Sequence, residues 1–391
     1  MKKKKIVWIT LLIVTFTLVS CIKDEAKNKE CDILKAWVQS DEYASYFSDQ
    51  NLMHKDNISS IENEITFTVR LGALQHLSHV PVHFEITSGA TIEPANGSAQ
   101  DFTAGPVTYT VTSEDGAWTR QYKVSFVEPS FPTFKFGFEN VEVFDNVLTK
   151  SQYHIFYDFD ESGQRQNFWS TPNPGAAVTL GFSHQPEDFP TYSVEDGYVG
   201  KGVCLETIST GLMGQQLKKP FSPGTIYFGK FILENLITNT TRTTQFGIRV
   251  TREPLRVTGY YKYTPGEKFI DKDSKEIVGR IDEGCIYALF YKNKDAQGKD
   301  YYIYAGDVVD QSRLGTIDNV YRYARIEKVI STDKWTYFEM YFDGLDVDPQ
   351  EVADGAFNMA LVFASSKDGS FFEGAVGSKL YIDEVEVTFK N

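Results

Sequence analysis

Carboxylates are the first side chains to consider, because the chain carries 53 Asp and Glu residues against 39 Lys and Arg residues. Hydrolysis of a glycosidic bond needs two carboxylates, about 5 Å apart for retention and up to about 9.5 Å apart for inversion. Glu195 and Asp196 are adjacent, so in an extended segment they point to opposite sides. Either one could face Asp282, Glu283 or Glu373 from a later part of the chain. Composition does not select a pair, so hydrolysis stays one hypothesis among several.

Other catalytic signatures are absent from the sequence. It contains no Gly-x-Ser-x-Gly nucleophile elbow, no His-Glu-x-x-His zinc motif and no Walker A phosphate loop. The segment 197–202 reads Gly-Tyr-Val-Gly-Lys-Gly, which is rich in glycine but has the wrong spacing for a phosphate cradle. We predict that this segment is a loop that crosses tightly beneath a neighbouring part of the chain.

Aromatic side chains make up 14% of the chain and suit a different chemistry. A pyranose packs its axial C–H groups on an aromatic face, while its hydroxyl groups need a few fixed polar partners. Trp169 and Tyr198 lie in segments punctuated by glycine and proline, where exposure is expected. Alternation along the strand that starts near Val257 places Tyr261 and Tyr263 in the core and Tyr260 and Lys262 on the open side. The candidate ligand-binding residues are Trp169, Tyr198, Tyr260 and Lys262; the alternative is that the rings fill a large core.

The elements that must position these side chains are strands. Alternation of apolar and polar residues with period two recurs along the chain, and long helical periodicity is absent. The alternation within residues 32–128 predicts an immunoglobulin-like β-sandwich, a fold of about 100 residues. The Pro-containing stretch 128–132 breaks the alternation and predicts a linker. Residues 133–391 predict a larger jelly-roll β-sandwich, so the expected fold class is all-β.

The last predicted strand changes its parity. Leu380 and Ile382 share one face, whereas Val385, Val387 and Phe389 fall on the other unless an extra residue intervenes. We therefore predict a β-bulge at residue 383 or 384.

Two acids suggest a structural calcium ion. Glu139 precedes the first strands of the large domain and Asp383 lies in the predicted bulge of the last. Jelly-roll sugar-binding modules often hold Ca²⁺ where the first and last strands meet, and Ca²⁺ prefers carboxylate and carbonyl oxygens. No other cofactor is expected.

The N-terminus predicts a lipid anchor. A basic patch at residues 2–5 precedes an apolar run, residues 6–19, which suits a signal peptide better than a membrane span. The sequence Leu-Val-Ser-Cys at 18–21 resembles a lipobox, which makes residues 1–20 a lipoprotein signal peptide, Cys21 the lipidated residue and residues 21–31 a tether. Lys23-Asp24-Glu25 resembles the signal that directs Bacteroidetes lipoproteins to the outer face of the outer membrane. We expect an outer-membrane, cell-surface protein.

Charge and cysteine content narrow the partners. The formal net charge of −14 disfavours binding to phosphate backbones, so nucleic acid is not an expected partner. Besides Cys21 the chain has Cys31, Cys204 and Cys285. The last two could form a disulfide or remain buried free thiols.

Several long motifs resemble a known family. They are WSTPNPG (169–175), PTYSVEDGYVGKGVCLET (190–207), REPLRVTGYYKYTPGE (252–267), DEGCIYALFYK (282–292) and LVFASSKDGSFFEGAVGSKLYIDEVEV (361–387). In this order they resemble the putative carbohydrate metabolism domain of Bacteroidetes surface lipoproteins. The segments CDILKAWV (31–38) and TIEPANGSAQDFTAGPVTYTVTSEDG (91–116) resemble the immunoglobulin-like spacer that precedes that domain. The resemblance implies a carbohydrate-related role for residues 133–391.

Three functional hypotheses follow. The first is a surface lipoprotein whose jelly roll binds a polysaccharide or oligosaccharide and whose lipid is held by a membrane. The second is a glycoside hydrolase or related carbohydrate-active enzyme with a carboxylate pair that the sequence does not reveal. The third is a structural or adhesive surface protein in which both sandwiches are spacers.

Overall fold

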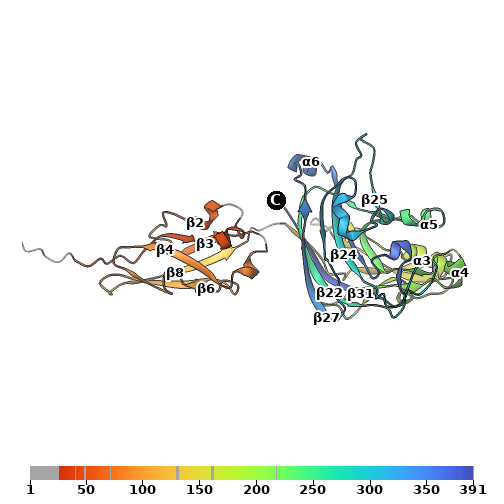
Figure 1. The fold of residues 1–391 in the computed structure, drawn as a ribbon, viewed down its shortest axis with the longest axis horizontal. Helices are drawn as coiled ribbons and strands as arrows, with labels where there is room; N and C mark the ends of the chain where they lie inside the picture. Colours follow the sequence, from red (N-terminus) through yellow and green to blue (C-terminus); the bar gives the residue numbers. More distant parts are fainter. Residues whose placement is uncertain are drawn as a thin grey trace, which may run out of the picture. The chain divides into compact units, whose positions relative to one another are not determined.

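The computed structural model of the chain describes residues 26–39, 41–47, 50–70, 72–128, 132–159, 163–216 and 218–390. The predicted signal peptide and the lipidation site Cys21 lie outside these residues. The chain divides between Ser130 and Phe131 into two compact units, both drawn in Figure 1. Within the described part, no helix is long and apolar enough to cross a membrane.

The N-terminal unit is a sandwich of two four-stranded sheets, with orders β2-β1-β4-β6 and β3-β8-β7-β5. Its strands alternate as predicted: along β8, Tyr122, Val124 and Phe126 are buried, and the residues between them are not. Phe67 and Tyr109 join them in the core. The strands are β1 (Ile33–Val38), β2 (His54–Lys55), β3 (Glu64–Thr68), β4 (Val80–Ile86), β5 (Thr91–Glu93), β6 (Ala99–Gln100), β7 (Val107–Thr112) and β8 (Thr119–Val127), and the helix is α2 (Asp41–Ala44).

The larger unit is a sandwich of a six-stranded and a nine-stranded antiparallel sheet. The six-stranded sheet has the order β15-β16-β31-β22-β27, with β9 also paired to β31. Its strands are β9 (Thr133–Phe136), β15 (Thr191–Val194), β16 (Gly202–Glu206), β22 (Pro254–Thr264), β27 (Thr332–Tyr341) and β31 (Lys379–Phe389). The all-β sandwich architecture predicted for both parts of the chain is confirmed.

The nine-stranded sheet has the order β25-β20-β19-β29-β24-β26-β28, with β14 paired to β19 and β21 to β29. Its strands are β14 (Trp169–Ser170), β19 (Thr225–Phe231), β20 (Thr244–Phe246), β21 (Ile248–Val250), β24 (Cys285–Lys292), β25 (Ile303–Tyr304), β26 (Val320–Arg325), β28 (Asp343–Gly344) and β29 (Phe357–Ala364). Two-stranded ribbons complete the unit: β10 (Val141–Asn146) with β11 (Ser151–Phe156), β12 (Asp158–Phe159) with β13 (Arg165–Gln166), β17 (Ile208–Ser209) with β18 (Phe221–Ser222), and β23 (Phe269–Ile270) with β30 (Gly374–Ala375).

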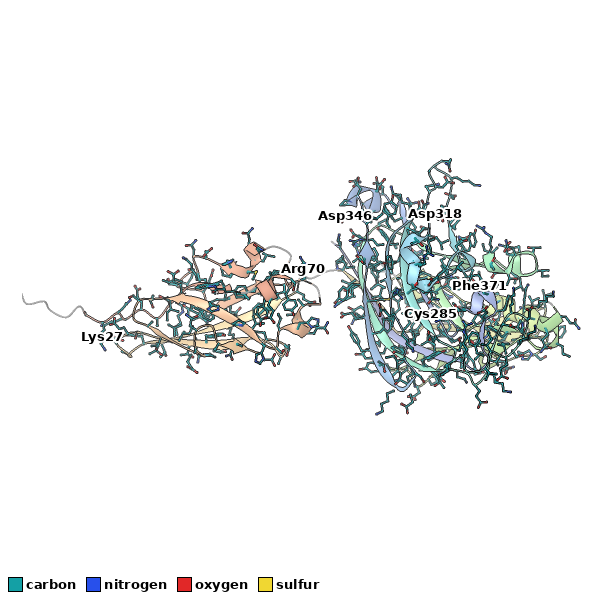
Figure 2. The ribbon with its side chains drawn as sticks, in the orientation of Figure 1. Lys27, Arg70, Cys285, Asp318, Asp346 and Phe371 are labelled. Carbon is teal, nitrogen blue, oxygen red and sulfur yellow. The ribbon has the colours of Figure 1, made fainter. Side chains whose placement is uncertain are left out.

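The nine-stranded sheet is buried on both of its faces. Along β24, Ile286 and Phe290 point into the core between the two sheets, whereas Tyr287 and Tyr291 belong to a second apolar cluster on the outer face. Cys285 lies in this second cluster, inside the unit (Figure 2). Cys31, Cys204 and Cys285 are all free thiols, so the disulfide alternative does not hold.

Helices cover that outer face. α3 (Asn173–Thr179), α4 (Gly211–Gln216) and α5 (Asn235–Thr238) lie on the side of the unit away from β22, β27 and β31, whereas α6 (Pro349–Ala353) lies elsewhere (Figure 1). Short 3₁₀ turns add to this cover: η4 (Thr240–Arg242), η5 (Ala305–Asp307), η6 (Gln311–Thr316) and η7 (Gly369–Phe371). The opposite face, on the six-stranded sheet, is left with exposed side chains.

The predicted bulge is confirmed in β31. Thr258 of β22 pairs with Glu386, but Tyr260 pairs with Asp383, so β31 has one residue more over this stretch. Glu384 adopts a φ of 48°, which accommodates that residue. Because of the bulge, Leu380 and Val387 point into the same core.

Candidate functional site

Trp169 does not form part of an exposed site. Its side chain is 4% exposed, and its ring packs against Phe228 at 4.5 Å and Phe136 at 5.3 Å between centroids. Its indole N–H donates to Asp158 Oδ2 over 3.0 Å. The prediction of an exposed ligand-binding Trp169 is therefore wrong. The residue opens the short strand β14, which pairs with β19 and turns the ring into the core.

Tyr198 and Tyr260 form a stacked pair on the outer face of the six-stranded sheet. Their ring centroids are 3.7 Å apart and their planes differ by 11°. Tyr337, opposite Tyr260 on β27, packs edge-on against it at 5.5 Å, and Trp335 packs edge-on against Tyr198 at 6.3 Å. Tyr198 is 45% and Tyr337 50% exposed. We call these four side chains the aromatic face.

Strand parity places Tyr260 on this surface. Along β22, Val257, Tyr261 and Tyr263 are buried in the core, as predicted from alternation. Tyr260 and Lys262 occupy the opposite parity and are half-buried. The structure thus brings together three of the four predicted ligand-binding residues, Tyr198, Tyr260 and Lys262, and separates them from the fourth.

Lys262 lies against rings of the same surface. Its Nζ is 4.6 Å from the ring centroid of Trp335 and 4.9 Å from that of Tyr381. A cation over an aromatic ring is stabilised by about 0.5–2 kcal/mol. Lys262 therefore holds Trp335 in place at the edge of the aromatic face and supplies a positive charge there.

A glycine-rich loop carries Tyr198 onto Tyr260. The backbone N–H of Lys201 donates to Glu139 Oε1 and that of Val199 to Asp383 Oδ2, both over 2.9 Å. Gly200 has a φ of +62°, and a Cβ there would collide with the Glu139 carboxylate that holds the loop. The positive φ and the close approach together favour glycine at this position. The predicted loop with close backbone approaches is present at 197–201, and β16 begins at Gly202.

These contacts do not fit the calcium ion predicted at Glu139 and Asp383. Both oxygens of Asp383 accept backbone N–H groups, from Val199 and from Glu384, and N–H donors repel a cation. Burial raises the pKa of Asp383 to about 6. Among the described residues, no group of three or more His, Cys, Asp or Glu side chains could hold a metal ion. The two acids are anchors for the loop.

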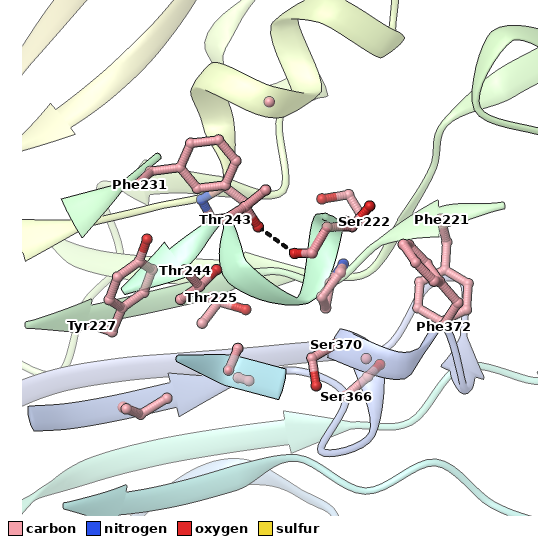
Figure 3. Close-up of a pocket in the computed structure, with 18 of the residues that line it drawn as sticks. Phe221, Ser222, Thr225, Tyr227, Phe231, Thr243, Thr244, Ser366, Ser370 and Phe372 are labelled. Atoms are coloured by element: carbon pink, nitrogen blue, oxygen red, sulfur yellow. Dashed lines mark hydrogen bonds between the residues drawn. The ribbon is translucent and has the colours of Figure 1, made fainter. Parts of the chain in front are cut away.

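A cavity that sequence reasoning missed lies under the helical cover, on the outer face of the nine-stranded sheet. It has a volume of about 130 Å³ and is lined from α3, β19, β20, β24, β29 and the turns η4 and η7. Figure 3 shows Thr225, Tyr227 and Thr244 reaching into it from the sheet, opposite Phe231 and Thr243. No short motif could have revealed it, because its walls come from segments spread over about 200 residues.

Comparison with known proteins places the chain in a family. A family model described as "Putative carbohydrate metabolism domain" matches residues 138–388. The chain belongs to this family. The family expected from the sequence motifs is confirmed. A second model, described as "SGBP, N-terminal", matches residues 47–126, within the N-terminal unit.

Two solved structures are similar to the chain. One, a putative glycoside hydrolase from Bacteroides thetaiotaomicron, is 31% identical, covers 94% of this chain and 99% of its own, and superposes with a TM-score of 0.57. The other, a putative glycoside hydrolase from Bacteroides vulgatus, is 33% identical, covers 67% of this chain and 99% of its own, and has a TM-score of 0.60. No curated protein matches the chain.

Four of the carboxylates singled out from the sequence are engaged by neighbouring side chains or amides. Asp282 is buried, and its Oδ2 accepts from Ser366, Ser378 and the N–H of Ala375. Glu283 pairs with Lys367 at 2.7 Å, Glu373 with Arg280 at 3.0 Å, and Glu195 with Lys201 at 3.6 Å. Each of these acids is occupied by its own local partner. No Asp or Glu is among the described residues that line the cavity.

Proposed function

We propose that the chain is a glycan-binding surface lipoprotein that holds a polysaccharide or oligosaccharide against its aromatic face without cleaving it. The observation that carries this proposal is the stacked pair Tyr198–Tyr260 with Tyr337 beside it, on the open face of a sheet. Exposed rings grouped on a rigid sheet are a surface suited to the C–H faces of sugars. Membership of a carbohydrate-related family supports the same ligand class.

Such a site binds weakly. Covering one ring stabilises a complex by about 25 cal/mol per Å² of apolar area, and each net hydrogen bond adds about 1 kcal/mol. Together these terms give micromolar to millimolar dissociation constants. A repeating polymer raises the effective affinity, because one chain offers many equivalent epitopes.

The predicted anchor suits this role. Lipid on Cys21, with display at the outer surface of the outer membrane, keeps the protein close to polymeric glycan outside the cell. The three acyl chains of a mature lipoprotein bury enough CH₂ groups for stable attachment, which one chain alone does not give. Residues 21–31 then act as the tether.

Hydrolysis is the second candidate function. Its support is the description of the two similar structures as putative glycoside hydrolases. Burial raises the pKa of Asp383 to about 6, but this side chain is fully buried and both of its oxygens accept backbone N–H groups, so it does not serve as a proton donor to a substrate. A hydrolase would use a carboxylate pair elsewhere on the chain.

One experiment separates the two functions. The full chain is screened against a panel of polysaccharides, and binding and release of reducing ends are measured on the same samples. We expect binding to at least one polysaccharide without release of reducing ends. Release of reducing ends by the wild type, lost in a single carboxylate substitution that keeps both the fold and polysaccharide binding, would establish the hydrolase instead. Absence of binding to any member of a broad panel would count against both.

A further inference from the structure

The rings of the aromatic face continue along β27 to Tyr341. Phe338 and Met340 of this strand point into the core, so the residues that alternate with them point outward. Of these, Tyr337 is 50% and Tyr341 41% exposed. At about 3.3 Å per residue, Tyr341 lies about 13 Å from Tyr337 and about 20 Å from Trp335 along the strand. This row is longer than one sugar ring, so a ligand that contacts all of it must contain several sugar units.

A charged pair fills the space between Tyr337 and Tyr341. Glu339 lies between them on β27, and Arg256 of β22 is the cross-strand partner of Tyr341. Arg256 Nη1 is 3.1 Å from Glu339 Oε1, and the two side chains keep 19% and 15% of their surface exposed. The hydroxyl of Tyr337 is 3.5 Å from the same carboxylate oxygen. Burial, and then the hydrogen bond to Glu339, raise the pKa of Tyr341.

We call Tyr341, Arg256 and Glu339 the Tyr341 cluster. It combines an exposed ring with fixed polar groups that are bonded to one another. The ring suits the C–H face of a sugar, and the polar groups suit the hydroxyls at its edge. The cluster therefore repeats, farther along β27, the chemistry of the aromatic face with Lys262.

The charges on the outward positions of this sheet are balanced. Three ion pairs lie there, and they are Arg256–Glu339, Lys135–Glu386 and Lys379–Glu206. A fourth cation, Lys262, lies against rings, and a fourth acid, Glu384, acts as a nearby negative charge on Tyr260. This surface therefore gives a polyanion no net attraction, and the net charge of −14 of the whole chain repels it.

We propose that one uncharged polysaccharide lies along β27 and contacts both the aromatic face and the Tyr341 cluster. This inference rests on the proposed function and adds the course, the length and the charge class of its ligand. The continuity of exposed rings along one strand supports the course, and the matched charges support an uncharged ligand. Contacts at two places on one chain raise its affinity without strengthening either contact.

The first test measures affinity against ligand length. Oligosaccharides of increasing length are prepared from a neutral polysaccharide that binds the full chain, and each is titrated calorimetrically into wild type and Tyr341→Ala. The affinity of wild type should rise with length until the ligand reaches both places. In Tyr341→Ala the rise should stop at a shorter length, and the longest oligosaccharide should bind about tenfold more weakly or worse. The melting temperature should stay close to that of wild type, because the substitution is at the surface.

Two variants make this test specific. Tyr341→Phe keeps the ring and should bind the longest oligosaccharide as wild type does. Tyr302→Ala removes an exposed tyrosine that directly precedes β25 of the other sheet, and should leave the dependence on length unchanged. The same dependence on length in wild type and Tyr341→Ala would overturn the extended site.

The second test changes charge at similar size. Hydroxyethyl and carboxymethyl derivatives of one neutral polysaccharide carry substituents of similar size, but only the second is anionic. The carboxymethyl derivative should bind wild type about tenfold more weakly or worse at physiological ionic strength, and less so at about 1 M salt, where the Debye length is about 3 Å. Equal or tighter binding of the carboxymethyl derivative, or binding of acidic polysaccharides alone, would overturn the uncharged ligand.

The variants also separate this inference from the proposed function. Polysaccharide binding that is weakened in Tyr198→Ala but equals wild type in Tyr341→Ala at every ligand length would refute the inference alone. Absence of binding to any polysaccharide would refute both.

Discussion

At the scale of single residues, Trp169 and Tyr198 belong to the same unit but have opposite environments. Trp169 is enclosed by aromatic rings of the core and bonded to Asp158, whereas about half of Tyr198 faces solvent. Both occur in segments rich in glycine and proline. Nearby glycine and proline residues therefore do not predict whether a ring is exposed. For Trp169 the pairing of β14 with β19 decides it, because this pairing turns the ring into the core.

Trp169→Ala should destabilise the large unit by about 3–5 kcal/mol, the usual cost of a large aromatic truncation in a core. The substitution also leaves Asp158 without its indole donor. Tyr198→Ala should cost about 1 kcal/mol or less, as a surface change does. Urea unfolding followed by circular dichroism measures both. A Trp169→Ala protein as stable as Tyr198→Ala would contradict the assignment of Trp169 to the core.

Asp158 gives a pH dependence to stability. Burial raises its pKa to about 6, from an ordinary value of 3.8, so the native state binds the proton more tightly than the unfolded state. The resulting stabilisation is complete below pH 3.8 and is lost as the pH rises to about 6. Asp158→Asn, which keeps an acceptor for Trp169, should reduce this loss between pH 4 and pH 7 by on the order of 2 kcal/mol.

Urea midpoints at the two pH values check this prediction. Burial also raises the pKa of Asp383, so the fall of the unfolding free energy between the two pH values should become smaller in Asp158→Asn without disappearing. An unchanged slope in Asp158→Asn would show that the buried carboxyl is not raised in pKa.

At the scale of elements, the loop 197–202 determines whether the aromatic face exists. Its amides are held by Glu139 and Asp383, and it places the Tyr198 ring on Tyr260. Asp383 follows the core residue Ile382, so alternation along β31 turns its carboxylate towards this loop, and the bulge at Glu384 returns Val385 to the core. The loop and the two acids that hold it therefore create the surface together.

Gly200→Ala should disrupt this arrangement. A Cβ at this residue would collide with Glu139, and its positive φ adds about 1–2 kcal/mol of backbone strain. We expect a changed aromatic circular dichroism signal and weaker glycan binding. Gly298→Ala is matched in φ, at +78°, but has open space around the added Cβ. If both variants bind glycan equally well, the loop does not control the site.

Much of the sandwich could be predicted, because buried and exposed positions alternate along its strands. That alternation located the core positions Tyr261 and Tyr263, the open position Tyr260 and the bulge. Lys262 was placed correctly for the same reason. The aromatic partners Trp335 and Tyr337 could also have been found, since they lie on β27, a strand that alternates and pairs with β22.

The rest depends on contacts between distant segments. The acids Glu139 and Asp383 do meet at one loop, but hydrogen bonds from backbone amides, which leave no pattern in the sequence, occupy them instead of calcium. The cavity is likewise built from threonines and phenylalanines that are ordinary in any β-sandwich.

At the scale of the whole molecule, the two units have different features. The N-terminal unit matches an SGBP N-terminal model, and the larger unit carries both the aromatic face and the cavity. A lipid on Cys21 would place the N-terminal unit next to the membrane end of the chain. The larger unit would then be the part that meets glycan.

Cys21→Ser tests the anchor. Without the thiol the diacylglyceryl group has no attachment point, so the variant should incorporate no labelled fatty acid and should leave the membrane fraction. Cys31→Ser is the control, since Cys31 is a free thiol in the N-terminal unit. A Cys21→Ser protein that stays with membranes as wild type does would refute the lipid anchor.

The central claim is that glycan binds on the aromatic face. The most direct measurement is the affinity of one polysaccharide for the wild type, Tyr198→Ala and Tyr337→Ala. The control is Tyr302→Ala, because Tyr302 is an exposed tyrosine that directly precedes β25 of the nine-stranded sheet. We predict that Tyr198→Ala and Tyr337→Ala each weaken binding by about tenfold or more, a loss of at least about 1.4 kcal/mol of binding free energy. The melting temperatures of both variants should stay close to that of the wild type. Wild-type affinity in both variants would contradict the claim.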